Sequence, residues 1–262
     1  MKLYDVHTHI QDERMAGQRH QVVERAVSAG VCRIMVCGLH EHDWDDVLNM
    51  AKTHDALVPA LGIHPWFIES RSSVWDATLT RMLSESGAAV GEIGLDGMIR
   101  PRNDDDQERV FIRQLEIARD LGLPVNIHCR SAWGRMLAIL KSMGGLPHGG
   151  VIHSWSGSVE MVREFEKLGA YISFSGSVTR PDNKKVQKAV QTVSRDRLVI
   201  ETDSPDILPT GVDADLNEPS FVRSVLETVA LLRGEKDADV AEYTFNNAQR
   251  LFSTCRWKGI NP

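Results

Sequence analysis

Short apolar segments alternate with longer amphipathic segments along almost the whole chain. The apolar segments are rich in Val, Ile and Leu, a pattern that favours strands buried on both faces of a parallel sheet. We predict eight such strands, over Lys2–His9, Val31–Gly38, Leu57–Ile63, Ala89–Leu95, Pro124–Cys129, Val151–Ser154, Tyr171–Ser175 and Leu198–Asp203.

The intervals between the strands have helical periodicity. In Asp105–Leu121, apolar residues recur at the spacing of one helix face, and similar patterns predict helices over Glu218–Arg233 and Asp237–Phe252. Strands that alternate with helices predict parallel βαβ units. Eight units in a chain of 262 residues fit a closed barrel better than an open sheet. We therefore predict an α/β fold, a TIM-like (β/α)8 barrel in which residues 1–262 form a single domain.

Polar residues gather where the predicted strands end. His7 and His9 close the first strand, and because side chains two apart lie on the same face, both imidazoles can reach one ion. The carboxyl ends of barrel strands converge on one mouth. The other polar residues at these ends are Glu92, His128, His153 and Asp203.

A structural role is the alternative for each of these residues taken alone. A single core histidine is often only hydrogen-bonded, but a carboxylate such as Glu92 in an apolar strand is costly to bury unless it is paired or bound. Six nitrogen and oxygen ligands around one cavity suit Zn²⁺, Mn²⁺, Co²⁺ or Mg²⁺, and exceed what one tetrahedral ion needs. We therefore predict two divalent metal cations per chain. The histidines in predicted helices and loops are expected at the surface: His20, His40, His42, His54 and His148.

Composition limits the possible partners and location. The formal net charge of −6 argues against a protein that coats nucleic acid with a basic face. The four cysteines form no CxxC pair, and we expect reduced thiols. No apolar run is long enough for a membrane span and the N-terminus does not resemble a signal peptide, so we expect a cytoplasmic protein. No obligate protein partner is evident.

Several motifs together resemble the TatD family of metal-dependent hydrolases, within the amidohydrolase-like superfamily. They are DVHTH, GIHP, GEIGLD, LPVNIHCR, HSWSGS, ETDSP, NEP and NNAQRLF, in that order along almost the whole chain. The resemblance implies that one ion is held by His7, His9, Glu92 and Asp203, and the second by Glu92, His128 and His153. Glu92 would then bridge the two ions.

The resemblance also implies a reaction, the hydrolysis of phosphodiesters, with some members acting as 3′→5′ exonucleases on DNA or RNA. We expect Asp203 to be the catalytic residue that accepts the proton of the attacking water. The substrate would be a nucleic acid end or a small phosphoester. A deacylase or another amidohydrolase-type ester or amide hydrolase is the alternative, and a binding protein on a retained barrel is a third.

Three further residues are candidates for binding substrate. His64, in GIHP, is a donor to a substrate phosphate or a residue that caps a turn. Arg130 follows the fifth strand and either binds an anion or forms a salt bridge at the rim. Trp155 either offers a face for base stacking or packs under a loop. The chain departs from the family pattern at Gly97–Met98, Ser154–Trp155 and Asp206, all near the pocket.

Overall fold

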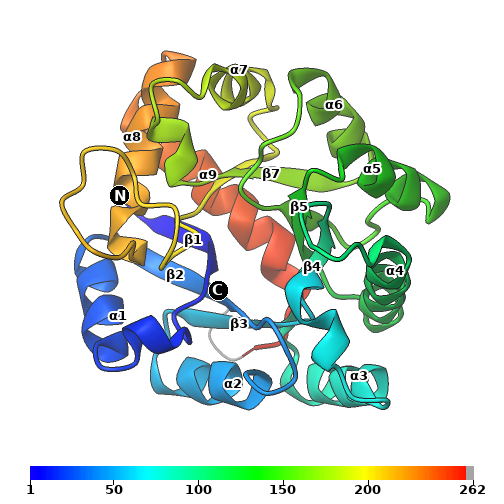
Figure 1. Ribbon diagram of the computed structural model, residues 1–262. Coiled ribbons are helices and arrows are strands. Elements are labelled where there is room, and N and C mark those ends of the chain that lie inside the picture. The colour runs from blue at the N-terminus through cyan, green and yellow to red at the C-terminus, as the bar shows by residue number, and fades with distance from the viewer. Residues whose placement is uncertain (258–262) are drawn as a thin grey trace.

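Eight parallel strands run in the order β1 to β8, each paired with the next along the chain, in a computed structural model that describes residues 1–257. Helices alternate with the strands and surround the sheet (Figure 1). The predicted barrel is confirmed, and the last five residues of the predicted domain lie outside the described residues. The strands are Leu3–Thr8 (β1), Val31–Cys37 (β2), Leu57–Leu61 (β3), Ala89–Asp96 (β4), Val125–Arg130 (β5), Gly150–Ile152 (β6), Ala170–Phe174 (β7) and Leu198–Ile200 (β8).

The helices around the barrel have bounds close to those expected where the sequence made a prediction. They are Arg19–Ser28 (α1), Trp44–Thr53 (α2), Trp75–Ser86 (α3), Asp104–Leu121 (α4), Trp133–Ser142 (α5), Val159–Lys167 (α6), Lys184–Thr192 (α7), Val222–Arg233 (α8) and Asp237–Leu251 (α9). Short 3₁₀ turns are Glu13–Met15 (η1), Pro65–Ser70 (η2), Gly176–Thr179 (η3), Pro219–Phe221 (η4) and Phe252–Thr254 (η5).

The ends of α4 illustrate why the sequence folds locally as it does. Its first turn carries Asp104, Asp105 and Asp106, whose charges interact favourably with the helix dipole. It stops at Gly122, which has a φ of 70° and donates its N–H to the carbonyl of Ala118. This left-handed conformation favours glycine, so the helix ends at Leu121 and Gly122 caps it.

The barrel closes between β8 and β1 mainly through contacts beyond the regular ladder. One parallel bridge joins Thr8 to Ser204. The buried carboxylate of Asp5 accepts hydrogen bonds from the N–H of Thr202 at 2.9 Å and from its hydroxyl at 2.6 Å. The N–H of Asp203 donates to the carbonyl of His7 at 3.1 Å. The segment after β8 is thereby held against the end of β1.

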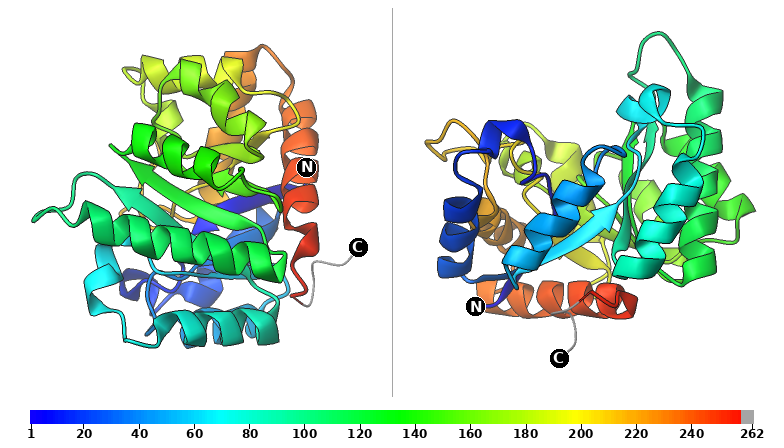
Figure 2. Two further views of the ribbon diagram at one scale, coloured as in Figure 1. Left: turned by 90° about the vertical axis from the view of Figure 1, so that its right-hand side faces the viewer. Right: turned by 90° about the horizontal axis from the view of Figure 1, so that it is seen from below.

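Apolar side chains fill the barrel interior from the end at which the strands begin. Helix α9 lies across that end (Figure 2), and its residues pack with side chains that point inward from the strands. The inner cluster includes Tyr4, Val6, Met35, Cys37, Val58, Ala60, Ala89, Val151, Tyr171, Val199, Ala248, Leu251 and Phe252. A larger cluster lies between the strands and the surrounding helices. The opposite end, where the strands finish, is the mouth of the barrel.

Two other expectations can be compared with the structure. All four cysteines are free, as expected, and Cys37, Cys129 and Cys255 are buried. Within residues 1–257, no helix combines the length and the apolar character needed to span a membrane.

Candidate metal centre

The six side chains predicted as ligands converge at the mouth of the barrel. His7 lies in β1, Glu92 in β4 and His128 in β5, whereas the other three follow the ends of β1, β6 and β8. Strand β8 is shorter than predicted, so Asp203 lies three residues beyond it and is held by the seam with β1.

The first group of ligand atoms surrounds one oxygen of Glu92. Its Oε2 lies 3.4 Å from His7 Nε2 and 3.2 Å from His9 Nε2. Asp203 Oδ1 lies 3.6 Å and 3.8 Å from the same two nitrogens. Two imidazole nitrogens and two carboxylate oxygens therefore face one point.

The second group surrounds the other oxygen of Glu92. Its Oε1 lies 2.9 Å from both His128 Nδ1 and His153 Nε2, and these two nitrogens are 3.1 Å apart. His64 Nε2 is 3.5 Å from the same oxygen. The two oxygens of a single buried carboxylate are thus divided between two clusters of histidine nitrogens.

Register irregularities in β1 and β4 aim these side chains. Between Asp5 and Thr8, three residues of β1 advance against two of β2, and Val90–Ile93 does the same against β5. An extra residue reverses the inward and outward alternation of a strand. Val6 can therefore fill the apolar interior while His7 and His9 also point inward, and Glu92 points inward above Ala89.

The ring nitrogens of His7 and His9 that face away from the cluster have acceptors. His7 Nδ1 lies 2.8 Å from Asn126 Oδ1, and the amide of Asn126 donates to the carbonyl of Val6 at 2.8 Å. This orientation makes Nδ1 of His7 the protonated nitrogen. His9 Nδ1 lies 2.9 Å from the carbonyl of Cys37. In both rings the lone pair of Nε2 is left to face the cluster, as metal binding requires.

His153 and His128 also place one ring nitrogen against a supporting carboxylate and the other toward Glu92. His153 uses Nδ1 for the supporting contact, and His128 uses Nε2. His153 Nδ1 lies 3.4 Å from Glu201 Oε1, so Nε2 is free for a ligand. His128 Nε2 lies 3.4 Å from Asp96 Oδ2, so Nδ1 is free. Four histidines therefore direct four ring nitrogens at the two oxygens of Glu92, an arrangement that fits divalent cations, which would replace the protons on these nitrogens.

His64 has the reverse arrangement of its ring nitrogens. Its Nδ1 accepts a hydrogen bond from the N–H of Trp66 at 3.1 Å, which caps η2. Burial lowers the pKa of His64 well below its usual value, so the ring is neutral and its single proton lies on Nε2. His64 therefore presents an N–H, and not a lone pair, to the cluster. Both roles expected for this residue are compatible with its position.

Burial and charge act in opposite directions on the carboxylates. Burial alone would raise the pKa of Glu92, but the surrounding histidines outweigh it and hold that pKa well below its ordinary value. Burial raises the pKa of Asp203, and the nearby histidines offset this only in part. Burial lowers the pKa of His9, yet its contacts with Glu92 bring the net value to about 9.

The two other substrate candidates have different surroundings. Arg130 is exposed at the end of β5, and its guanidinium has no hydrogen-bond or ion-pair partner within residues 1–257, so the expected rim salt bridge is not formed. Trp155 is 0% exposed and its ring lies 4.5 Å from Trp133 and 5.5 Å from Phe165. The stacking role for Trp155 is wrong, because its ring is enclosed in the outer core and cannot meet a base.

The remaining histidines do not belong to the two clusters, although His40 packs on Phe67, whose ring also lies near His64. His20 and His42 are exposed, and His40, His54 and His148 are half-buried, close to the surface position expected.

Three supporting residues were not assigned from the sequence: Asn126, Asp96 and Glu201. Asn126 and Glu201 each lie two positions before a predicted ligand, on the same face of the chain, and this spacing could have identified them.

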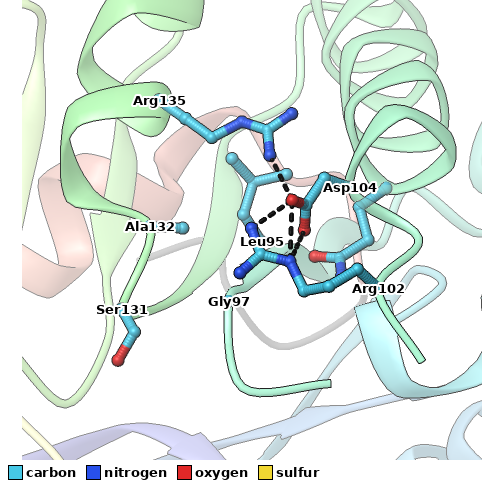
Figure 3. Close-up of a pocket in the computed structure, with 8 residues that line it drawn as sticks. Leu95, Gly97, Arg102, Asp104, Ser131, Ala132 and Arg135 are labelled. Carbon is cyan, nitrogen blue, oxygen red and sulfur yellow. Dashed lines mark hydrogen bonds and ion pairs between the residues drawn. The ribbon is translucent and has the colours of Figure 1, made fainter. Parts of the chain in front are cut away.

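A small cleft beside the mouth is formed by the segments that follow β4 and β5 (Figure 3). Arg102 and Arg135 both bind the carboxylate of Asp104 there, with Arg135 at 2.8 Å. Its volume of about 20 Å³ leaves room for roughly one water molecule, so it is not a substrate pocket.

Comparison with known proteins points in one direction. A sequence model described as TatD related DNase matches residues 4–253. The chain is 35% identical to a Bacillus subtilis protein named uncharacterized metal-dependent hydrolase YabD, over 95% of this chain and 98% of that one. It is 30% identical to the 3′-5′ ssDNA/RNA exonuclease TatD of Erwinia tasmaniensis, over 96% of this chain and all of that one.

A solved structure extends this likeness to the fold. The crystal structure of YjjV, a TatD homologue from Escherichia coli, superimposes with a TM-score of 0.91 at 31% identity, covering 96% of this chain and 98% of that chain.

Proposed function

The chain belongs to the TatD family of metal-dependent hydrolases, and from this premise we propose that it binds two divalent cations and removes nucleotides from the 3′ ends of single-stranded nucleic acid. His7, His9, Glu92 and Asp203 would hold one cation, and Glu92, His128 and His153 the other. The observation that carries the proposal is the division of the two Glu92 oxygens between two histidine clusters.

The chemistry follows from these groups. When bound, two adjacent divalent cations would lower the pKa of a water molecule and stabilise negative charge that develops on an attacked phosphate. Asp203 Oδ1 faces His7 and His9, which leaves the second oxygen of the carboxylate to accept the proton of the attacking water.

An anionic substrate suits the charge of this centre. Two dications with the two ligand carboxylates and four neutral imidazoles would leave a charge of about +2 on the ions and their ligands, which the carboxylates of Asp96 and Glu201 behind the histidines reduce. His64 Nε2–H and the unpaired guanidinium of Arg130 are donors for phosphate oxygens. An uncharged ester or amide would use fewer of these groups.

The end of a single strand is the form of nucleic acid that fits best. The centre lies at a barrel mouth, and a chain with a net charge of −6 lacks the basic track that holds long duplex. Zn²⁺, Mn²⁺, Mg²⁺ and Co²⁺ are the candidate ions, and the four imidazole nitrogens favour Zn²⁺ over Mg²⁺, which prefers oxygen ligands. The cytoplasmic location and the absence of an obligate protein partner remain predictions.

The direct test compares substrates on one metal-loaded preparation: linear single-stranded DNA labelled at its 5′ end, the same sequence circularised, single-stranded RNA, a p-nitrophenyl phosphoester and an aminoacyl ester. We expect a 5′-labelled ladder that shortens from the 3′ end and no cleavage of the circle. Comparable cleavage of the circle would overturn the exonuclease assignment. Turnover of the acyl ester with no phosphoester cleavage would favour the deacylase alternative.

A further inference from the structure

Trp66 is an exposed aromatic residue at the edge of the candidate metal centre. It lies in η2, directly after the segment that carries His64, and 59% of its surface is exposed. A single exposed apolar side chain is common on a protein surface, so what distinguishes Trp66 is its position beside the metal centre. Its indole ring stands nearly perpendicular to the imidazole of His64, with ring centroids 5.0 Å apart and an interplanar angle of 88°.

The indole is held in a fixed position relative to the second histidine cluster. Its Nε1 donates to Asp96 Oδ2 at 2.8 Å, and the same oxygen lies 3.4 Å from His128 Nε2. One carboxylate thus connects Trp66 to a predicted metal ligand. An aromatic residue that is anchored at its polar end and exposed at its ring face is pre-organised for a planar ligand.

A second exposed apolar residue is held by the same carboxylate. The N–H of Met98 donates to Asp96 Oδ1 at 2.8 Å, and half of Met98 is exposed. Arg130 pairs with Asp96 in the ladder between β4 and β5, and its side chain is exposed. The indole of Trp66 and the backbone of Met98 are therefore fixed by Asp96, and the exposed side chains of Met98 and Arg130 start from positions next to it.

We propose that Trp66, supported by Met98, is a stacking platform for the nucleobase of a nucleotide that flanks the scissile phosphate, with Arg130 contacting the strand. The proposal rests on the proposed function and specifies how that site recognises its substrate. Every base offers a π-face, so the platform selects unpaired nucleotides without selecting sequence. A duplex end would have to fray before its base could reach the indole.

Two substitutions separate stacking from the hydrogen bond to Asp96. Trp66→Ala removes the ring but keeps the backbone N–H that His64 accepts, whereas Trp66→Phe keeps an aromatic face and loses only the indole donor. The substrates are (dT)10, and the same decamer with an abasic residue on one or the other side of the terminal phosphodiester. Val74→Ala, an equally exposed apolar position between η2 and α3, is the matched control.

We expect Trp66→Ala to lower kcat/KM on (dT)10 by about 10-fold or more, the scale of one stacked base. Trp66→Phe, which keeps an aromatic face but loses the hydrogen bond to Asp96, should lose clearly less than Trp66→Ala, and Val74→Ala should remain within about 3-fold of the wild type. The wild type should cleave one of the two abasic substrates with a kcat/KM as low as that of Trp66→Ala on (dT)10. On that abasic substrate, Trp66→Ala should lower kcat/KM little further. Equal losses on all three substrates, or equal losses in the Ala and Phe variants, would overturn the platform.

Binding measured without turnover distinguishes failure of the platform from failure of the proposed function. In the metal-loaded Asp203→Asn variant, (dT)10 should quench tryptophan fluorescence, a fully abasic decamer should not, and adding Trp66→Phe should abolish the quenching. Trp66-dependent quenching without nucleic acid cleavage would keep the platform and refute the exonuclease. Exonuclease activity that changes neither with Trp66→Ala nor with an abasic residue would refute the platform and keep the exonuclease assignment.

Discussion

Asn126 determines which nitrogen of His7 is available to a metal. Its amide donates to the carbonyl of Val6, so its oxygen must accept the proton of His7 Nδ1. Glu201, Asp96 and the carbonyl of Cys37 do the same for the three other predicted histidine ligands. Groups outside the predicted ligand set therefore orient the histidine rings toward the metal sites.

Replacing Asn126 by Leu should weaken metal binding without removing a ligand. His7 would lose the acceptor that fixes its tautomer, and partners of this kind contribute about 10- to 100-fold in affinity. Competition with a coloured chelator measures the dissociation constant, and Asn49→Leu on the exposed face of α2 is the control. Unchanged affinity in Asn126→Leu would show that the histidine orientation has another origin.

Asp203→Asn should separate catalysis from metal binding. The amide keeps one oxygen ligand but is not a base, and of the second cluster only His153 lies near Asp203. We expect near-normal metal content with turnover reduced about 100-fold or more, the scale of a lost general base. Recovery to near wild-type turnover at saturating metal would show that Asp203 is a ligand only.

The convergence of the six predicted ligands could be foreseen from the sequence, but the exposure of individual aromatic side chains could not. His7, His9, Glu92, His128, His153 and Asp203 could be identified because strand ends of a barrel must converge. Nothing in the sequence separates Trp155, which is enclosed by Trp133 and Phe165, from Trp66, which is exposed at the mouth. Exposure depends on how loops and helices pack, and a strand pattern carries no information about that.

At the scale of elements, the irregularities in β1 and β4 matter more than the strand bounds. Predicted and observed strand ends differ by few residues, mainly because β6 ends at Ile152 and β8 at Ile200, before the predicted ends. The extra residues in β1 and β4 were not predicted. A single inserted residue leaves little trace in the short pattern of apolar and polar positions of one strand. The extra residues allow an apolar interior and a polar mouth on the same strands.

Gly94 in β4 lies at a position where the structure has no room for a side chain. Its φ is 151°, and a Cβ there would lie 2.0 Å from the carbonyl oxygen of His128. We expect Gly94→Ala to destabilise the protein by about 3 kcal/mol or more, since β5 would have to shift. Urea unfolding measures this. Gly134→Ala in α5, where a Cβ meets no atom within 4 Å, should be neutral or slightly stabilising. Similar stability of the two variants would contradict the close packing of β4 on β5.

At the scale of the whole molecule, stability and chemistry occupy opposite ends of the barrel. Helix α9, Phe252 and Cys255 cover the end at which the strands begin (Figure 2), and the predicted ligands lie at the mouth. The alternation of strands and helices made the barrel predictable. The packing of α9 across the end at which the strands begin could not be predicted. Amphipathicity shows that one face of a helix is buried, but it does not show which surface that face contacts.

Phe252→Ala should therefore affect stability and spare the centre. The ring is fully buried in the inner cluster and contacts Tyr4, with ring centroids 5.7 Å apart. We expect a loss of about 3–5 kcal/mol in the free energy of unfolding, as for other buried aromatic residues. Leu231→Ala, at a position that is 81% exposed, should change it by less than about 0.5 kcal/mol. A changed metal stoichiometry in folded Phe252→Ala would show that the two ends are coupled.

The most direct test of the account is a calorimetric titration of Mn²⁺ or Zn²⁺ into metal-free protein, wild type beside Glu92→Gln. The wild type should bind two ions per chain, because each Glu92 oxygen faces its own histidine cluster. Both ions should weaken together in Glu92→Gln, since the variant removes the negative charge that the two sites share. A wild-type stoichiometry of one ion at saturation, or a Glu92→Gln protein that loses one ion and keeps the other at full affinity, would contradict a centre bridged by Glu92.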